Sequence, residues 1–103
     1  MSSQTMLPED CATMDEVRRG VDETDRAIMA LFDRRFGYMR AAARIKQDRA
    51  LVRDEARKHA VVAAIRADAA ARGLPADALA DLWDRLVELS IAYELAEWER
   101  IRA

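Results

Sequence analysis

Apolar side chains recur at three- and four-residue intervals through the first half of the chain, which is the spacing of one face of an α-helix. No proline interrupts the run, which comprises Val17, Val21, Ile28, Leu31, Phe32, Met39, Ala42 and Ile45. Thr13 and Glu16 precede it at the spacing of a capping box, in which each side chain accepts from the other residue's backbone N–H. The pattern predicts one helix that begins after Thr13 and ends near Gln47 or Asp48.

The predicted helix is long for a chain of this size. About 34 residues at 1.5 Å each make a rod of about 50 Å, whereas a compact domain of this length has a radius of gyration of about 13 Å. Such a rod cannot cover its apolar stripe within its own chain. We therefore expect two chains to pack their long helices side by side in a homodimer.

Capping and turn signals predict two further helices. Asp54 is a suitable N-cap for a helix that continues to about Ala71. Gly73 suits a left-handed position after that helix, and Pro75 suits the first turn of a third helix that runs to about Arg100.

The predicted fold class is all-α. Three glycines and two prolines are too few for the turns of an all-β fold. At 103 residues the chain has room for one domain. We expect an N-terminal arm over residues 1–12 and a single three-helix domain over residues 13–103.

Composition excludes several classes of function. The net charge of −2 lacks the strongly basic balance of a protein that binds nucleic-acid phosphates. Cys11 is the one cysteine and His59 the one histidine, so a disulfide framework or a Cys/His metal site is not expected. No apolar run approaches the ~20 residues that span a bilayer, and the N-terminus lacks the pattern of a secretion signal. We expect a cytoplasmic protein without nucleic-acid or membrane partners.

Three cations within the long apolar helix are candidates for ligand binding: Arg18, Arg35 and Lys46. Arg35 and Lys46 lie eleven residues apart, about three turns, and so point from nearly the same face. Arg18 is about 25 Å from Arg35 along the axis and rotated by about 100°, so only an antiparallel partner chain could bring it to the same pocket. Spacing alone favours the plainer interpretation, in which these are solvated charges.

Four further polar residues have both a structural and a functional interpretation. Asp54, next to Arg57, is as easily a helix cap as a ligand contact, and Ser90 can simply bond its own helix backbone. Glu94 is less ordinary, because it stands on a largely apolar helix. A carboxylate there should be exposed, paired with an arginine, or protonated more easily than a free glutamate.

The ordered set of these residues resembles that of the all-helical, type II chorismate mutases, including the isochorismate pyruvate lyases. The matching residues, spread over nearly the whole chain, are Arg18, Val21, Asp22, Asp25, Arg34, Arg35, residues 41–46, Val52, Arg53, Asp54, Arg57, Ser90 and Glu94. The run Pro-Glu-Asp-Cys at residues 8–11 is similar to the start of the lyases. The resemblance implies an intertwined homodimer of three-helix chains, with one arginine of each active site coming from the other chain.

The resemblance also implies roles for the matched residues, with chorismate as substrate. The substrate-binding residues would be Arg18 from the partner chain, Arg35, Lys46, Asp54, Arg57 and Ser90, and the catalytic residues Lys46, Glu94 and Arg35. The three arginines would hold the two carboxylates of chorismate and order the pocket. Lys46 would contact the side-chain carboxylate and the ether oxygen, Asp54 would lie near the ring hydroxyl, and Ser90 would line the pocket.

The family reaction is a Claisen rearrangement of chorismate to prephenate, in which the ether bond breaks as a carbon–carbon bond forms. The resemblance therefore implies no nucleophile, no metal and no other cofactor. Cations hold the dianion in its reactive shape, and hydrogen-bond donors meet the negative charge that develops on the ether oxygen.

Two positions depart from the family pattern. Where the bacterial mutases and the lyase commonly carry a glutamine that donates to the ether oxygen, this chain has Glu94, which can donate only when protonated. We therefore expect turnover to rise toward acidic pH. Lys58 stands where some mutases have a glutamate for the ring hydroxyl, which leaves Asp54 as the expected partner of that group.

The alternatives stay open at this point. We favour a mutase because residues 52–54 resemble the mutases, whereas the lyase has a proline-containing loop there. An isochorismate pyruvate lyase, giving salicylate and pyruvate, is the nearest alternative, and a 4-amino-4-deoxychorismate mutase is a third. From a different class, the chain could be a helical module that dimerises and binds another protein.

Overall fold

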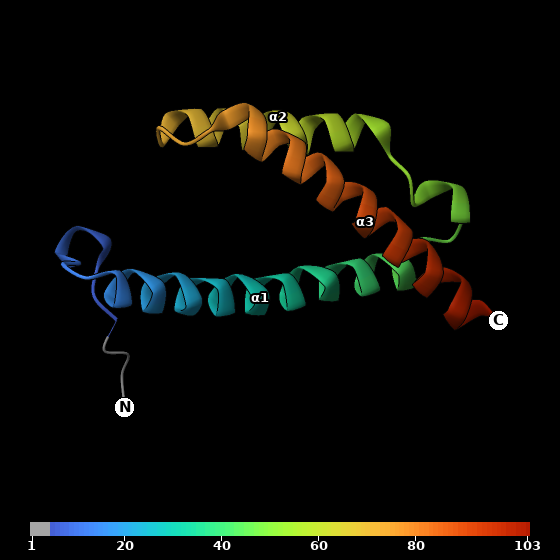
Figure 1. Cartoon of the computed structure of the whole chain (residues 1–103). Helices are drawn as coiled ribbons and strands as arrows, with labels where there is room; N and C mark the ends of the chain where they lie inside the picture. The colour runs from blue at the N-terminus through green and yellow to red at the C-terminus, as the bar shows by residue number, and fades with distance from the viewer. Residues whose placement is uncertain (1–4) are drawn as a thin grey trace. The chain divides into compact units, whose positions relative to one another are not determined.

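A computed structural model describes residues 5–103, and all of its regular elements are helical (Figure 1). In chain order they are a 3₁₀ helix η1 (Pro8–Asp10), α1 (Met14–Ile45), a second 3₁₀ helix η2 (Arg49–Leu51), α2 (Glu55–Ala71) and α3 (Ala76–Arg102). The described part of the chain has no strand, so the predicted all-α, three-helix fold is confirmed. The first four residues of the predicted arm lie outside the described residues.

The start of α1 follows the predicted capping box. Glu16 N donates to Thr13 Oγ1 at 3.2 Å, and Glu16 Oε1 accepts from the backbone N–H groups of Thr13 (3.0 Å) and Ala12 (2.8 Å). These bonds satisfy N–H groups that have no partner inside the helix. The helix contains 32 residues, about 48 Å at 1.5 Å each, and ends at Ile45, slightly before the predicted position.

The boundaries of α2 are also those expected from the local sequence. Asp54 is the N-cap, and its carboxylate accepts from Arg57 N at 2.9 Å. At the other end Gly73 has φ 71°, its N–H bonds to Ala70 O, and Leu74 N bonds to Ala69 O. This pair of bonds is a Schellman motif, which needs a residue that adopts positive φ without strain.

The beginning and end of α3 differ slightly from the prediction. Pro75 is the residue before the helix instead of part of its first turn, and the helix continues to Arg102 instead of Arg100. The predicted link between the first two helices contains η2, which Asp48 caps by accepting from Ala50 N at 2.9 Å. Among the described residues, no helix is both long and apolar enough to cross a membrane.

The chain forms two compact units, residues 1–35 and 36–103, and the boundary falls within α1. In the second unit α2 packs against α3. The buried apolar residues of the described chain all belong to this unit: Ala43, Val52, Ala69, Ala80, Leu86 and Ile91. No large apolar side chain among the described residues is fully buried.

Within the second unit, the last part of α1 is held against α3 by polar and aromatic contacts. The rings of Phe36 and Tyr93 meet edge to face with their centroids 4.9 Å apart. Arg40 Nη1 donates to the Tyr93 hydroxyl at 2.8 Å. These contacts bring the C-terminal end of α1 beside the second half of α3, which is where two of the predicted catalytic residues are found.

Candidate active site

The end of α1 and the second half of α3 bring together two predicted catalytic residues, Lys46 and Glu94. Lys46 directly follows the last residue of α1, and its Nζ lies 2.7 Å from Glu94 Oε2. The Glu94 side chain is 5 % exposed and that of Lys46 is 29 % exposed. The sequence analysis allowed three states for Glu94: exposed, paired with an arginine, or protonated. The structure buries it and pairs it with a lysine.

The contact to Glu94 is an ion pair without a directed hydrogen bond. Oε2 is buried, and none of the described groups donates to it with hydrogen-bond geometry, although the Lys46 ammonium is in contact. A buried carboxylate depends strongly on such a cation, because water cannot solvate it in the cation's place. In this pair the Glu94 oxygen receives no hydrogen bond from the described residues, and the Lys46 ammonium remains partly accessible to a ligand.

Ser90 lies one turn before Glu94 on α3 and is buried, with 3 % of the residue exposed. Its hydroxyl donates to Leu86 O at 2.7 Å, within the same helix. The bond to its own helix backbone that the sequence allowed is therefore present, and a contact with a substrate stays a prediction. The position still places a small polar group next to Glu94 on a largely apolar helix.

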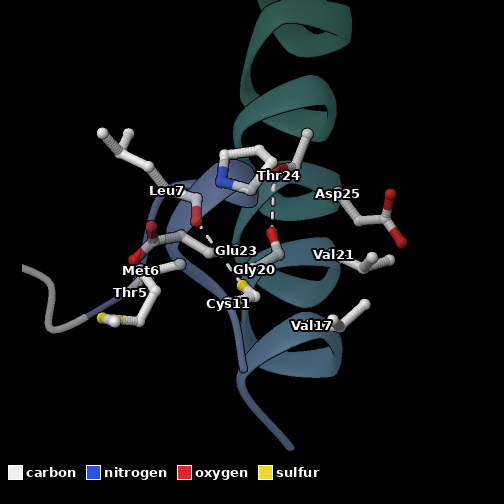
Figure 2. A pocket seen from close by; sticks show the side chains of 11 residues that line it. Thr5, Met6, Leu7, Cys11, Val17, Gly20, Val21, Glu23, Thr24 and Asp25 are labelled. Carbon is white, nitrogen blue, oxygen red and sulfur yellow. Dashed lines mark hydrogen bonds between the residues drawn. The ribbon is translucent and has the colours of Figure 1, made fainter. Parts of the chain in front are cut away.

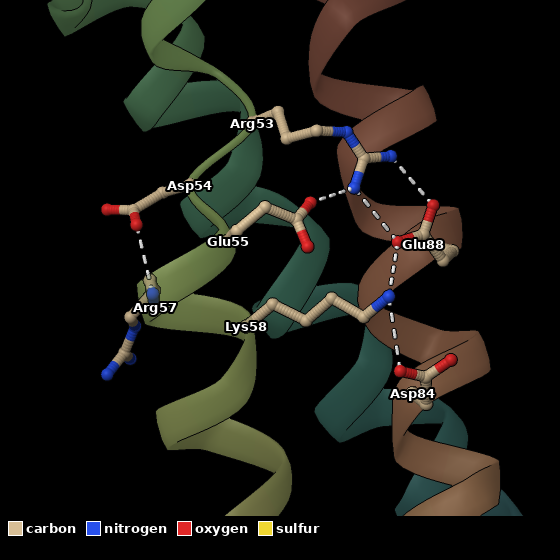
Figure 3. A network of polar contacts seen from close by, with 7 residues as sticks. All are labelled: Arg53, Asp54, Glu55, Arg57, Lys58, Asp84 and Glu88. Carbon is tan, nitrogen blue, oxygen red and sulfur yellow. Dashed lines mark hydrogen bonds and ion pairs between the residues drawn. The ribbon is translucent and has the colours of Figure 1, made fainter.

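Asp54 and Arg57 lie at the start of α2, and both are exposed. One oxygen of Asp54 caps the helix through the backbone of Arg57. Figure 3 shows the Arg57 guanidinium pointing away from α3. The cap role of Asp54 is confirmed, and a contact with a substrate hydroxyl stays a prediction.

Arg18 and Arg35 belong to the unit of residues 1–35. Arg18 is exposed on α1, and Arg35 is partly buried. Their participation in the same site as Lys46 stays the prediction made from helical spacing and from the family resemblance.

A network of charged side chains that the sequence did not predict connects the start of α2 with α3 (Figure 3). Arg53 donates to both oxygens of Glu88, at 2.8 and 3.1 Å, and to Glu55 at 2.6 Å. Lys58 Nζ lies 2.7 Å from Glu88 Oε2 and 3.1 Å from Asp84 Oδ1. The network joins residues that flank Asp54 and Arg57 to the helix that carries Ser90 and Glu94.

This network shifts the titration of its members. Hydrogen bonds from Arg53 and then from Lys58 lower the pKa of Glu88 to about 2. The pKa of Lys58 is raised, first by its hydrogen bond to Glu88 and then by that to Asp84. The charges are therefore maintained over the whole physiological pH range.

Comparison with known proteins places this chain in a family. Residues 17–95 match the family model described as Chorismate mutase type II. The chain belongs to this family. It is also 28 % identical over 95 residues to the isochorismate pyruvate lyase of Pseudomonas aeruginosa, and the match spans 92 % of this chain and 94 % of that protein.

Membership of the chorismate mutase family confirms the resemblance predicted from the sequence and makes the chain an enzyme that acts on a small molecule. The family model is named for a mutase and the relative for a lyase. The two matches together establish the class of enzyme and not the reaction.

A cavity in the first unit is a poor candidate for the site of a dianionic substrate of this family. It has a volume of about 460 Å³ and lies between residues 5–11 and the first turns of α1 (Figure 2). Its lining is mainly apolar, and it includes the carboxylates of Glu23 and Asp25 but no lysine or arginine. A dianion there would face like charges with no cation to offset them.

Lys58 explains one departure from the family pattern in this chain. The sequence raised the question of what replaces the glutamate that some mutases have at this position. The Lys58 side chain is 15 % exposed and is occupied by Glu88 and Asp84 of α3. Lys58 therefore connects α2 with α3 in this chain, and a contact between Asp54 and the ring hydroxyl stays a prediction.

Proposed function

We propose that this family member is a chorismate mutase, which rearranges chorismate to prephenate. The observation that carries the proposal is the Lys46–Glu94 pair, a partly accessible cation against a buried carboxyl group. These are the two groups that a site for ether-bond cleavage needs beside the ether oxygen: a point charge and, when Glu94 is protonated, a hydrogen-bond donor. The family model named for a mutase supports the assignment.

Catalysis in this proposal is electrostatic and conformational. Arg35, Arg57 and the partner subunit's Arg18 pair with the two carboxylates through their planar guanidinium groups and hold the compact conformer that reacts. As the ether C–O bond breaks and the new C–C bond forms, negative charge grows on the ether oxygen. Lys46 and the protonated Glu94 stabilise that charge where it develops.

Because Glu94 is paired with Lys46, protonation of Glu94 would have two effects. In the free protein the ionised Glu94 holds the Lys46 ammonium at 2.7 Å, so it competes with any substrate carboxylate for that cation. A proton on Glu94 removes this competition and supplies the donor. Both effects favour turnover at acidic pH.

Isochorismate pyruvate lyase is the second candidate, supported by the relative from P. aeruginosa. The same cations would hold isochorismate, and the products would be salicylate and pyruvate. Residues 52–54 favour the mutase, and here they form the end of the link and the cap of α2.

A paired assay tests the proposal. The purified protein is given chorismate and isochorismate in separate reactions at pH 5 and pH 7.5, and prephenate and salicylate are quantified. Prephenate as the main product, formed faster at pH 5, is expected. Salicylate as the main product would replace the mutase with the lyase. No turnover of either substrate would overturn both assignments.

We also propose that the active form is a homodimer. The apolar stripe predicted on α1 is exposed in the single chain, with Val21 53 % and Leu31 61 % exposed. A second chain would cover this stripe, and it would also be the source of the second Arg18 that each site requires.

A further inference from the structure

The C-terminal end of α1 is capped by side chains of α3. Arg102 Nη1 donates to Ala43 O at 3.0 Å, and Arg102 Nη2 donates to Lys46 O at 2.7 Å. Trp98 Nε1 donates to the same Lys46 carbonyl at 3.0 Å. The backbone of Lys46 thus accepts two hydrogen bonds from residues more than fifty positions away in the sequence.

α1 needs this external cap because its own sequence lacks one. The last carbonyls of a helix have no partner within it, and they carry the negative end of the helix dipole. α2 solves this problem locally with Gly73, whereas Lys46, Gln47 and Asp48 after α1 include no glycine and no residue with positive φ. A guanidinium with several donors is suited both to the free carbonyls and to the dipole.

The capping residues share one face of α3 with Glu94. Positions 94, 98 and 102 are four residues apart, so their side chains lie one above the other along the helix. The Arg102 guanidinium lies 4.3 Å from the centroid of the Trp98 ring, a cation–π contact that restrains it. This face of α3 therefore holds Lys46 at both ends, with Glu94 at the ammonium and the other two residues at the carbonyl.

We propose that Trp98 and Arg102 are positioning residues, which fix the Lys46 backbone at the end of α1 and thereby direct its ammonium into the site. This inference rests on the proposed function, in which Lys46 contacts the substrate. A lysine stem is flexible, and a helix end frays when its carbonyls are unbonded, so an unclamped Lys46 would place its charge over a wider range of positions. A displaced charge weakens both substrate binding and stabilisation of the transition state.

The hydrogen bonds from Trp98 and Arg102 to the end of α1 are called the clamp below. Three variants test the clamp, and a fourth serves as a control. Arg102→Met removes both donors and the charge, Trp98→Phe removes the indole donor but keeps an aromatic ring, and Arg102→Lys keeps the charge with a smaller donor. Arg100→Met is the matched control, because Arg100 is an exposed arginine of the same helical turn that pairs with Glu97 of its own helix at 2.7 and 2.9 Å.

The kinetic readout is KM together with kcat. We expect Arg102→Met to raise KM at least threefold and to lower kcat/KM about tenfold, Trp98→Phe to act in the same direction with a smaller change, and Arg102→Lys to recover much of the loss. Arg100→Met should stay within twofold of the wild type. Partial unfolding would reduce the number of active sites without changing the KM of those that remain, so the rise in KM separates positioning from stability. An unchanged KM in Arg102→Met and Trp98→Phe would overturn the proposal.

Amide hydrogen exchange supplies a test without substrate. The Lys46 N–H donates to Ala42 O at 2.9 Å in the last turn of α1. Its exchange should accelerate in Arg102→Met and Trp98→Phe but not in Arg100→Met, and equal exchange in all of them would overturn the clamp. If the wild-type protein converts neither chorismate nor isochorismate, the proposed function fails, and the exchange rates then decide the existence of the clamp independently.

Discussion

At the scale of single residues, the central feature is a buried carboxylate that forms an ion pair with a lysine. Glu94 is 5 % exposed, and Lys46 is its ion-pair partner. Without that cation the carboxylate would be buried with no opposite charge beside it. Two predictions concern this pair.

The first prediction concerns the pH dependence of turnover. Glu94→Gln keeps a hydrogen-bond donor at every pH, so its kcat should vary less than about twofold from pH 5 to pH 8, while the wild-type rate rises toward pH 5. Steady-state rates across this range are the measurement. Glu97→Gln, a matched change on the same helix, should keep the wild-type profile. A slope in Glu94→Gln equal to that of the wild type would contradict the role of the proton.

The second prediction concerns stability. Lys46→Met leaves Glu94 buried without its cation, which should cost about 1–3 kcal/mol of unfolding free energy at pH 7, because the lost partner is itself partly exposed. The same change should cost clearly less in a Glu94→Gln background, where no charge is stranded. Urea unfolding of the four proteins at one chain concentration gives the coupling between the two sites. Additive effects would show that the pair is not energetically coupled.

At the scale of elements, ends and links decide where the functional groups lie. α1 ends beside α3 through a cap that α3 provides, and α2 starts beside α3 through the Arg53–Glu88–Lys58 network. Both arrangements hold a terminus in place, and both termini carry predicted site residues. The helices therefore serve as rigid supports for groups at their ends.

The α2–α3 network makes a prediction about acid unfolding. The pKa of Glu88 is about 2 in the folded chain and returns to its ordinary value of 4.5 on unfolding. Its contribution to stability is therefore complete above about pH 5 and is lost as the pH falls through 4.5 toward 2. The melting temperature of Glu88→Gln should lie furthest below that of the wild type at pH 5 and above, and the two should converge toward pH 2.

A second ion pair between the same helices provides the control. Arg66 donates to Asp77 at 3.2 Å, and the Asp77 side chain is 93 % exposed, so this pair contributes little. Asp77→Asn should keep the melting temperature of the wild type and its pH dependence. Wild-type pH dependence in Glu88→Gln would contradict the role assigned to the network.

At the scale of the whole molecule, the single chain leaves much of its apolar surface uncovered. The exposed large side chains include several members of the stripe predicted from the sequence, namely Val17, Val21, Ile28, Leu31 and Ile45. This surface is the basis of the proposed homodimer, in which each chain would supply its Arg18 to the site of the other. The proposal of a shared active site gives a direct test of that assembly.

Complementation between two inactive variants is the measurement. Arg18→Ala and Lys46→Met should each lose most activity, yet a mixture refolded together should regain it, because a mixed dimer has one site with both residues intact. Equal mixing makes half of the dimers mixed, so about one quarter of all sites should be active. Arg34→Ala in place of Arg18→Ala is the control for an arginine that has no predicted role. No recovery in a mixture that sediments as dimers would show that the sites are not shared.

The elements could be predicted from the sequence because their signals are local. The capping box of Thr13 and Glu16, the cap at Asp54 and the left-handed Gly73 each use groups no more than five residues apart, so the local sequence decides them. The small errors lie at helix ends without such a signal, as at Ile45 and Arg102. Lys46 and Glu94 were both singled out as candidates, but the contact between them was not predicted.

The sequence by itself therefore determined the fold class, the starts of α1 and α2, and the family, whose residues recur in a recognisable order. Only the tertiary structure decided that Lys46 is the partner of Glu94, that Glu88 gathers Arg53 and Lys58, and that α3 caps the end of α1. The physical reason is the distance along the chain between the residues that interact. A helix periodicity defines which face a residue occupies, whereas the partner across that face depends on how two distant segments pack against each other.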